Sequence, residues 1–324
     1  MKKYPKVSII IPLYKETEYF HEAVEKCLQL DYSDYEILIG VDKGVRLKCK
    51  DKKIRVLETG ELRTGPAEKR DIGIVKAKGE IIAFLDDDSY PDNKWLKNAV
   101  NILQKNKVAS VCGPGLTPPG DNFWQKITGA ILSSWFGSGP YRYRFVQESP
   151  RFVDDYPAYN MIVKRDVLIK VGGFGTKYYG GEDTAICIKL INAGEKIFYY
   201  PDIIVFHHRR RFPFEYGRQV GNVGLHRGYF VKAHSQTSLR VSYFGPAILL
   251  VSSIIFLILA IIDLQLVTPF VYLFILVYMV IFIEGFRKSS LIINIILPFA
   301  VFYNHFAYSI QFIKGLVFLK EMER

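Results

Sequence analysis

The sequence Ile81-Ile82-Ala83-Phe84-Leu85-Asp86-Asp87-Asp88 places three consecutive carboxylates directly after five apolar residues. A short apolar run without a polar interruption is typical of a strand that is buried on both faces of a parallel sheet. Ligands of such sheets bind outside the carboxyl ends of the strands. The acidic cluster is therefore expected to face a ligand crevice.

The first and third of these aspartates point to the same side of an extended chain. Two converging carboxylates repel each other unless a cation lies between them, and carboxylate oxygens are ligands that Mg²⁺ and Mn²⁺ prefer. The sequence therefore predicts a divalent-cation site that contains Asp86 and Asp88. The alternative is a solvated turn in which Asp88 or Ser89 caps the following helix.

Aliphatic runs and amphipathic segments alternate on both sides of this strand. Strands are expected at Val7–Ile11, Glu36–Val41 and Ile54–Leu57, and helices at Tyr19–Leu30, Ala67–Lys78 and Trp95–Gln104, the last with Asp92 as its cap. This order indicates an α/β fold with a mainly parallel sheet and helices on both faces. Residues Thr117–Arg151 are rich in Gly, Pro, Ser and aromatic residues, so they are expected to be irregular or to form a flexible loop.

A second acidic pair, Glu182 and Asp183, opens the helical run Thr184–Ile191, which Gly194 closes. Carboxylates in a first helical turn can simply complement the helix dipole. They can also accept a proton from an attacking hydroxyl group. A transfer that uses such a base and no protein nucleophile inverts the reacting carbon.

Two histidines, His207 and His208, follow a strand-like segment at Lys196–Phe206. An imidazole is a credible third metal ligand, but alternation along an extended chain lets only one of the two point inward. The alternative is that both are polar surface residues.

The sequence of 324 residues is 49% hydrophobic and yet carries a net charge of +11. Apolar and charged residues are therefore expected to be segregated, and the sequence indeed divides into a part of ordinary globular composition and a strongly apolar part. Three apolar segments, Val241–Ile262, Leu266–Phe286 and Leu291–Phe312, are each long enough to cross a bilayer. Basic Arg287 and Lys288 in the second connection, against Asp263 in the first, place the large domain in the cytoplasm and the C-terminus outside. A buried helical hairpin is the alternative.

Between Arg209 and Arg240, seven basic residues and interleaved aromatic residues accompany one acid, Glu215. Nucleic-acid-binding proteins show a similar mixture. Because this segment leads into an apolar span, an element that lies on anionic lipid is the stronger interpretation, and no nucleic-acid partner is expected. Some of the arginines are candidates to bind the phosphate of a lipid-linked acceptor. The four cysteines have no CxxC spacing, which indicates neither a zinc site nor a disulfide framework.

An ordered set of motifs spans about residues 5 to 208. The set comprises Ile10-Ile11-Pro12-Leu13-Tyr14-Lys15-Glu16, Val41-Asp42, Arg70-Asp71-Ile72-Gly73, Ala77-Lys78-Gly79-Glu80, Phe84-Leu85-Asp86-Asp87-Asp88, Gly172-Gly173-Phe174 and Gly181-Glu182-Asp183. Together these motifs resemble the family 2 glycosyltransferases of GT-A fold. The chain departs from the family pattern at Lys15 and Asp71, where asparagine is common, and at Lys43, where a second acid often occurs.

The resemblance implies roles for individual residues. The donor nucleotide would be bound by Pro12, Glu16, Asp42, Arg70 and Asp86, the metal by Asp86, Asp88 and His207, and the acceptor would be deprotonated by Asp183 with Glu182 beside it. Taken alone, Asp42 and Arg70 would be ordinary surface charges. A divalent cation would stabilise the charge of a departing nucleoside diphosphate.

The sequence thus predicts three regions: a catalytic domain at 1–208, a basic aromatic interfacial segment at 209–240 and a membrane region with three helices at 241–324. The predicted activity is metal-dependent, inverting transfer of a sugar from a nucleotide donor to a polyprenyl-linked saccharide at the cell membrane. A polyprenyl-phosphate glycosyl synthase is the first alternative. A processive polysaccharide synthase fits less well, because the chain lacks a clear Gln-x-x-Arg-Trp element, and a non-catalytic membrane module would leave the acidic set without a use.

Overall fold

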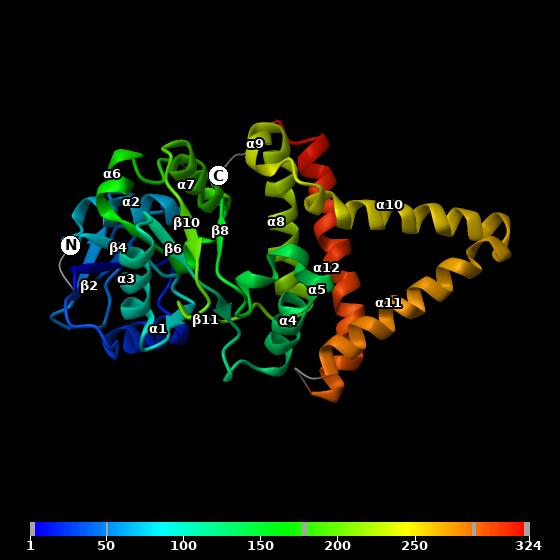
Figure 1. The fold of residues 1–324 in the computed structure, drawn as a ribbon, viewed down its shortest axis with the longest axis horizontal. Helices are drawn as coiled ribbons and strands as arrows, with labels where there is room; N and C mark the ends of the chain where they lie inside the picture. Colours follow the sequence, from blue (N-terminus) through cyan, green and yellow to red (C-terminus); the bar gives the residue numbers. More distant parts are fainter. Residues whose placement is uncertain (1–3, 50, 177–179, 287–289, 321–324) are drawn as a thin grey trace. The chain divides into compact units, whose positions relative to one another are not determined.

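The computed structural model describes residues 4–49, 51–176, 180–286 and 290–320 (Figure 1). The chain forms two compact units. Of the described residues, the first unit contains those up to Pro118 together with Val146–His208, and the second contains Pro119–Phe145 and those from Arg209 to Lys320. Each unit is described separately below.

The first unit is built on a mostly parallel sheet with the strand order β3-β2-β1-β4-β9-β6-β10-β8. Its strands are β1 Val7–Pro12, β2 Tyr35–Val41, β3 Ile54–Glu58, β4 Ile81–Phe84, β6 Ser110–Cys112, β8 Arg151–Val153, β9 Met161–Lys164 and β10 Ile197–Tyr199. Strands β3, β2, β1 and β4 run parallel to one another, whereas β9 is antiparallel to both of its neighbours, β4 and β6. A small second sheet has the order β5-β11-β7, with β5 Ser89–Pro91, β7 Gly115–Leu116 and β11 Val205–His207.

Helices cover both faces of the large sheet. They are α1 Glu18–Leu28, α2 Pro66–Lys76, α3 Trp95–Asn106, α6 Arg165–Lys170 and α7 Glu182–Asn192, with the 3-10 helix η2 Ala158–Asn160. One face packs Ile9 of β1 in a buried cluster with Phe20 of α1 and Leu96 of α3. On the other face, Gly73 of α2 approaches Ile10 so closely that a Cβ would collide with it. The predicted α/β fold is confirmed.

The strand order fixes where the site forms. The chain runs outward from β1 to β2 and β3 and then returns to place β4 on the other side of β1. The sheet therefore has a topological switch point between β1 and β4, where ligands bind in open α/β sheets. Leu85 donates its N–H to the Ile10 carbonyl oxygen at 3.1 Å, so the acidic run that follows Leu85 begins at this point.

Two local expectations for the first unit are wrong. Helix α3 begins after Lys94, and Asp92 instead accepts the Lys94 N–H at 2.9 Å in the preceding turn. The expected single strand at Lys196–Phe206 is two strands in different sheets, because a turn at Pro201 and Asp202 separates β10 from β11.

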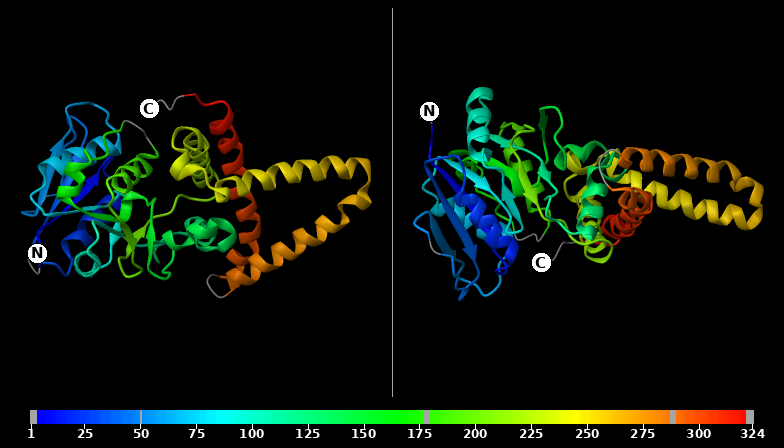
Figure 2. Two further views of the ribbon diagram at one scale, coloured as in Figure 1. Left: turned by 45° about the horizontal axis from the view of Figure 1, so that its top comes forward. Right: turned by 90° about the horizontal axis from the view of Figure 1, so that it is seen from below.

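The second unit is helical. It contains α4 Phe123–Ser133, α5 Trp135–Ser138, η1 Gly139–Arg144, α8 Phe214–Ala233, α9 Ser235–Ser238, α10 Val241–Ile262, η3 Leu264–Val267, α11 Thr268–Phe286 and α12 Leu291–Val317. Three helices are long and apolar enough to cross a membrane: Val241–Ile262, Thr268–Gly285 and Leu291–Val317. In Figures 1 and 2, α10 and α11 form a hairpin that projects away from α12.

The expectation that Thr117–Arg151 is irregular or a flexible loop is wrong, because the segment contains helices. Asn122 and Gln125 form a capping box that starts α4, and Ser134 caps α5. Ile127 and Ile131 of α4 are buried against apolar residues of α12, so this segment packs with the second unit. The polar and small residues that suggested a loop lie at the helix ends or, like Gly129, in the packed face.

The second and third apolar helices also differ from their expected bounds. Helix α11 begins at Thr268, because η3 takes the preceding residues, and α12 continues to Val317. The basic residues Arg287 and Lys288, on which the orientation was based, lie outside the described residues. The division of the sequence into domains at residues 208 and 240 stays a prediction.

Candidate active site

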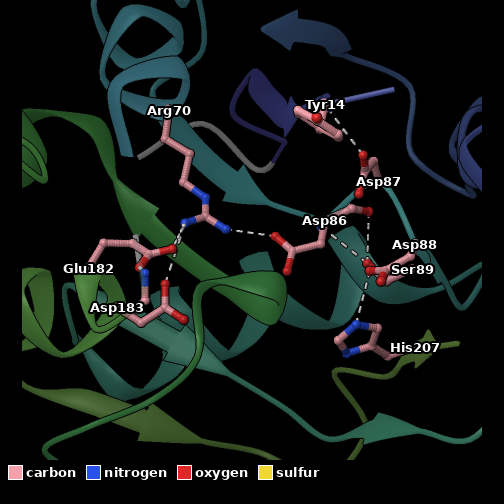
Figure 3. A network of polar contacts seen from close by, with 10 residues as sticks. Tyr14, Arg70, Asp86, Asp87, Asp88, Ser89, Glu182, Asp183 and His207 are labelled. Carbon is pink, nitrogen blue, oxygen red and sulfur yellow. Dashed lines mark hydrogen bonds and ion pairs between the residues drawn. The ribbon is translucent and has the colours of Figure 1, made fainter. Parts of the chain in front are cut away.

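The metal-binding residues expected from the sequence converge at the end of β4. Single ligand atoms of Asp86, Asp88 and His207 all lie within 4.8 Å of one another. The His207 Nε2 atom is 3.0 Å from Asp88 Oδ1 (Figure 3). Two carboxylates and an imidazole are a donor set that suits Mg²⁺ or Mn²⁺, so these residues fit a divalent cation.

Hydrogen bonds of Ser89 and the pairing of strands β5 and β11 position these three candidate ligands. The Ser89 hydroxyl accepts the Asp86 N–H at 3.1 Å and donates to the Asp86 carbonyl oxygen at 3.0 Å, which holds the acidic turn. Strand β11 pairs with β5 so that His207 lies opposite Ser89. The sheet pairing, and not the local sequence, therefore brings His207 to the aspartates.

The second histidine has a different environment. His208 Nε2 lies 2.9 Å from Glu22 Oε2 of α1, and the His208 ring stacks on Tyr19 at 3.9 Å between centroids. Its backbone N–H donates to the Asp88 carbonyl oxygen at 3.0 Å. Of the two histidines, the structure thus places His207 among the candidate ligands, while His208 ties β11 to α1 and to the acidic turn.

Arg70 joins the two acidic clusters. Its buried guanidinium donates to Asp86 Oδ1 at 2.6 Å and lies 3.5 Å from Glu182 Oε1 and 3.4 Å from Asp183 Oδ1 (Figure 3). Burial alone lowers the pKa of Arg70, but the surrounding carboxylates outweigh it and raise the pKa. One guanidinium faces three carboxylates here, so the site keeps an excess of negative charge that a divalent cation can compensate.

The acidic pair occupies the start of α7. Gly180 and Gly181 have φ values of 95° and 91°, a left-handed conformation that favours glycine. This turn directs the Gly180 N–H to Glu182 Oε2 at 2.8 Å. Glu182 is therefore bound from two sides and buried, whereas the Asp183 side chain keeps 30% of its surface exposed.

Burial and a neighbouring carboxylate raise the proton affinity of Asp183. Burial is the largest cause and proximity to Glu182 the next, and both raise the pKa of Asp183, while Arg70 opposes them. The net direction is upward. A partly exposed carboxylate with a raised pKa has the properties of a general base or acid.

Asp42 directly follows β2 and is buried among polar groups. Its Oδ1 atom accepts hydrogen bonds from the Thr64 hydroxyl at 2.5 Å and the Thr64 N–H at 2.9 Å, and lies 3.1 Å from Lys69 Nζ. Burial alone raises the pKa of Asp42, but the bonds from Thr64 and Lys69 outweigh it and lower the pKa. Asp42 is thus held as an oriented carboxylate.

The other predicted donor residues lie at the end of β1 and in the loop that follows it. Pro12 ends the strand, and Glu16 is 3.2 Å from His21 Nε2 of α1. Tyr14 is 70% exposed, and its N–H donates to Asp87 Oδ2 at 3.4 Å, so an aromatic ring stands at the open edge of the acidic turn (Figure 3).

Sequence reasoning missed two further residues. Lys69 is buried and donates to the Leu13 carbonyl oxygen at 2.7 Å as well as to Asp42. Asp71 accepts the N–H groups of Phe174 at 2.7 Å and Gly175 at 2.9 Å, which organises the glycine loop ahead of α7. The position of Asp71, next to Arg70 in the motif, was the available signal; Lys69 carried none.

Comparisons with known proteins identify the family of this chain. The family model of glycosyl transferase family 2 matches residues 8–172. A dolichyl N-acetyl-alpha-D-glucosaminyl phosphate 3-beta-D-2,3-diacetamido-2,3-dideoxy-beta-D-glucuronosyltransferase of Methanococcus voltae is 25% identical and aligns over 96% of this chain and 97% of its own. A glycosyltransferase of Haemophilus influenzae is 31% identical over 117 residues, which cover 34% of this chain and only 46% of that relative.

A solved structure shares the fold along most of the chain. The mannosyltransferase PcManGT from Pyrobaculum calidifontis, in complex with GDP-Man and Mn²⁺, matches with a TM-score of 0.56 at 18% identity and covers 98% of this chain and 88% of that one. The resemblance at the motifs and the family match over half of the sequence lead to the same assignment. The chain is a glycosyltransferase and belongs to glycosyl transferase family 2.

Proposed function

We propose that this enzyme is a divalent-cation-dependent, inverting glycosyltransferase that moves a sugar from a nucleoside diphosphate to a polyprenyl-linked saccharide at the cytoplasmic face of a membrane. The observation that carries the proposal is the Arg70 guanidinium, which holds the acidic turn of β4 and the acidic start of α7 in one network. In this proposal, the groups that would bind the donor and the groups that would activate the acceptor belong to a single site.

The donor diphosphate would be bound at the strand-end cluster. Asp86, Asp88 and His207 would hold a Mg²⁺ or Mn²⁺ ion, which when bound neutralises the charge of the leaving diphosphate. Arg70 would orient Asp86 and face the donor phosphates. Asp42 and the loop from Pro12 to Glu16 would bind the nucleoside, with Tyr14 available to stack on the base.

The acceptor would react at the start of α7. Asp183 would take the proton from the acceptor hydroxyl as its oxygen attacks the anomeric carbon, and the bond from that carbon to the diphosphate oxygen breaks on the opposite face. Glu182, bound by Arg70 and Gly180, would hold Asp183 at raised proton affinity. A single displacement of this kind turns an α-linked donor into a β-linked product.

A lipid-linked acceptor is supported by the second unit and by the Methanococcus relative, whose name specifies a dolichyl-linked substrate. Basic and aromatic side chains gather in this unit: Arg144 lies over the Tyr141 ring at 4.8 Å, and Arg227 and Arg240 lie over the Tyr243 ring at 4.9 Å and 6.0 Å. Guanidinium groups beside apolar helices suit a lipid phosphate.

A polyprenyl-phosphate glycosyl synthase is the second candidate, favoured by the same arginines. Its acceptor is already an anion and needs little help from a base. Retained activity in Asp183→Asn would favour this candidate, and loss of activity would favour the saccharide acceptor.

The test is transfer by the purified full-length chain in lipid nanodiscs. A panel of nucleotide sugars is supplied with membrane lipid extract, with and without a chelator, and products are identified by mass spectrometry and their anomeric configuration by NMR. We expect one β-linked sugar per acceptor and loss of transfer with chelator. A retained configuration, full activity with chelator, or a ladder of added sugars would each contradict the proposal. Glu25→Gln, on the exposed face of α1, is the matched control variant.

A further inference from the structure

The three apolar helices of the second unit differ in which faces they expose. On α11, the six consecutive residues 271–276 are all exposed, and α10 likewise exposes large apolar residues around its circumference. Apart from Leu291 at its first turn, helix α12 exposes its large apolar residues in one stripe: Ile292, Ile295, Phe299, Phe306, Ile310 and Val317. Spacings of three, four, seven and eleven residues place this stripe on one side of the helix. Helices that are apolar on all sides suit a position surrounded by lipid, whereas a helix with one apolar stripe suits the interface between lipid and a polar surface.

The opposite face of α12 packs on α8 along almost the whole of α8. The Tyr216 hydroxyl donates to Asn304 Oδ1 at 2.6 Å at one end, and Lys232 Nζ donates to the Leu319 carbonyl oxygen at 2.8 Å at the other. Between these contacts the backbones touch, since a Cβ at Gly224 or Gly228 would collide with the main chain of α12. Residue numbers increase in the same direction along both contacting segments, from Tyr216 with Asn304 to Lys232 with Leu319, so the two helices run parallel.

Helix α8 cannot cross hydrocarbon. Its outer face is exposed and polar, with Glu215, Arg218, Gln219 and Asn222. The stretch of α8 that pairs with α12 is about 25 Å long at 1.5 Å per residue, which is most of a hydrocarbon layer of about 30 Å. If α12 spanned the bilayer, this charged face would enter the hydrocarbon with it, which is strongly unfavourable.

The N-terminal half of α12 is covered in a similar way. Ile127 and Ile131 of α4 pack against Leu297 and Val301, and α4 exposes Lys126 on its outer side. Accordingly, 44% of the most apolar window of α12 is buried in protein, against 6% and 11% for α10 and α11. In Figures 1 and 2 the α10–α11 hairpin leads away from α12 and does not lie along it.

We infer that α12 lies in the plane of the membrane, with its stripe in the acyl chains of the leaflet that faces the catalytic unit, and that of the described helices α10 and α11 cross. The occupant of the stripe is lipid, because the stripe adjoins the apolar hairpin and because seven basic residues and one acid between Arg209 and Arg240 suit anionic headgroups. Two crossings return Lys320 to the side of the catalytic unit, whereas three would place it opposite.

Labelling in sealed proteoliposomes tests this topology. Single cysteines replace exposed Lys52, Gln265 or Lys320 in a Cys49→Ser background, in which the remaining cysteines are buried. A membrane-impermeant maleimide is added before or after lysis. We expect Lys52→Cys and Lys320→Cys to label from the same side and Gln265→Cys from the other. Labelling of Lys320→Cys together with Gln265→Cys overturns the inference, as does labelling of all three from one side.

Depth measurements provide the second test. Spin labels at Ile295, Phe299, Phe306 and Ile310 are compared with labels at Leu249, Ile254, Leu257 and Ile261 of α10, using oxygen and a nickel chelate as relaxing agents. An in-plane α12 gives one depth at all four positions, while depth changes steadily along α10. A difference of about 16 Å between Ile295 and Phe306, as expected for a span along the membrane normal, overturns the inference. Neither readout depends on catalysis, so failure here leaves the proposed function intact.

Discussion

The two acidic clusters of the site both consist of carboxylates, but the surroundings of these carboxylates differ. The cluster at the end of β4 offers Asp86 and Asp88 with His207 in contact, and its excess negative charge calls for a cation. In the cluster at the start of α7, burial and the proximity of Glu182 raise the pKa of Asp183, so this carboxylate binds a proton more readily. Environment therefore distinguishes the two clusters, which we propose bind a cation and a proton respectively, although Arg70 contacts both.

The largest expected effect is at the strand end. Asp88→Asn removes one charge of the candidate metal site, and we expect transfer to fall by about 10³-fold or more, because stabilisation of the leaving group by a cation is worth several kcal/mol. Turnover and Mn²⁺ affinity are measured on the same preparation. Wild-type turnover together with unchanged Mn²⁺ affinity would remove the distinction between the clusters.

Next in size is the proton-binding pair. Asp183→Asn keeps the size and the helix but cannot accept a proton, so we expect kcat to fall by about 10²–10³-fold while Mn²⁺ affinity is unchanged. Steady-state kinetics and metal titration check both halves of this expectation. Loss of Mn²⁺ binding would show that the two clusters act as one.

A smaller loss is expected where the clusters meet. Arg70→Lys keeps the charge but replaces a planar fork by a single ammonium, so one of the contacts to Asp86 and the acidic pair is lost, and we expect about a tenfold decrease in kcat/KM. Arg55→Lys, at the Glu36 ion pair away from the site, is the matched control. Equal effects in the two variants would argue against a joining role for Arg70.

The smallest effect is the pH response of the unmodified enzyme. Because the pKa of Asp183 is raised, this group is protonated as the pH falls through its pKa, and the active carboxylate is lost. We expect kcat to be level above this pKa and to fall by less than tenfold between the pKa and one pH unit below it. The pH dependence of the residual activity of Asp183→Asn provides the check, since this variant should lack the decrease of kcat at acidic pH. If the variant keeps this decrease, another group causes it.

The sequence predicted the strand end well and the surroundings less well. Five apolar residues before Asp86 indicate a buried strand from composition alone, and the structure has β4 there. The helices between Asn122 and Arg144 were missed, because their apolar residues Ile127 and Ile131 become a recognisable face only when α12 packs against them. Likewise, no local pattern links Asp71 to the glycine loop around Phe174, since that contact crosses about a hundred residues.

By itself, the sequence determined the parallel α/β unit, the acidic runs and the apolar segments, because burial periodicity and charge are local properties. Tertiary structure alone decided that the imidazole of His207, and not that of His208, contacts the Asp88 carboxylate, that Arg70 contacts both acidic clusters, and which face of α12 is covered. Each of these depends on strand pairing or helix packing between distant segments, where a single register sets the direction of a side chain.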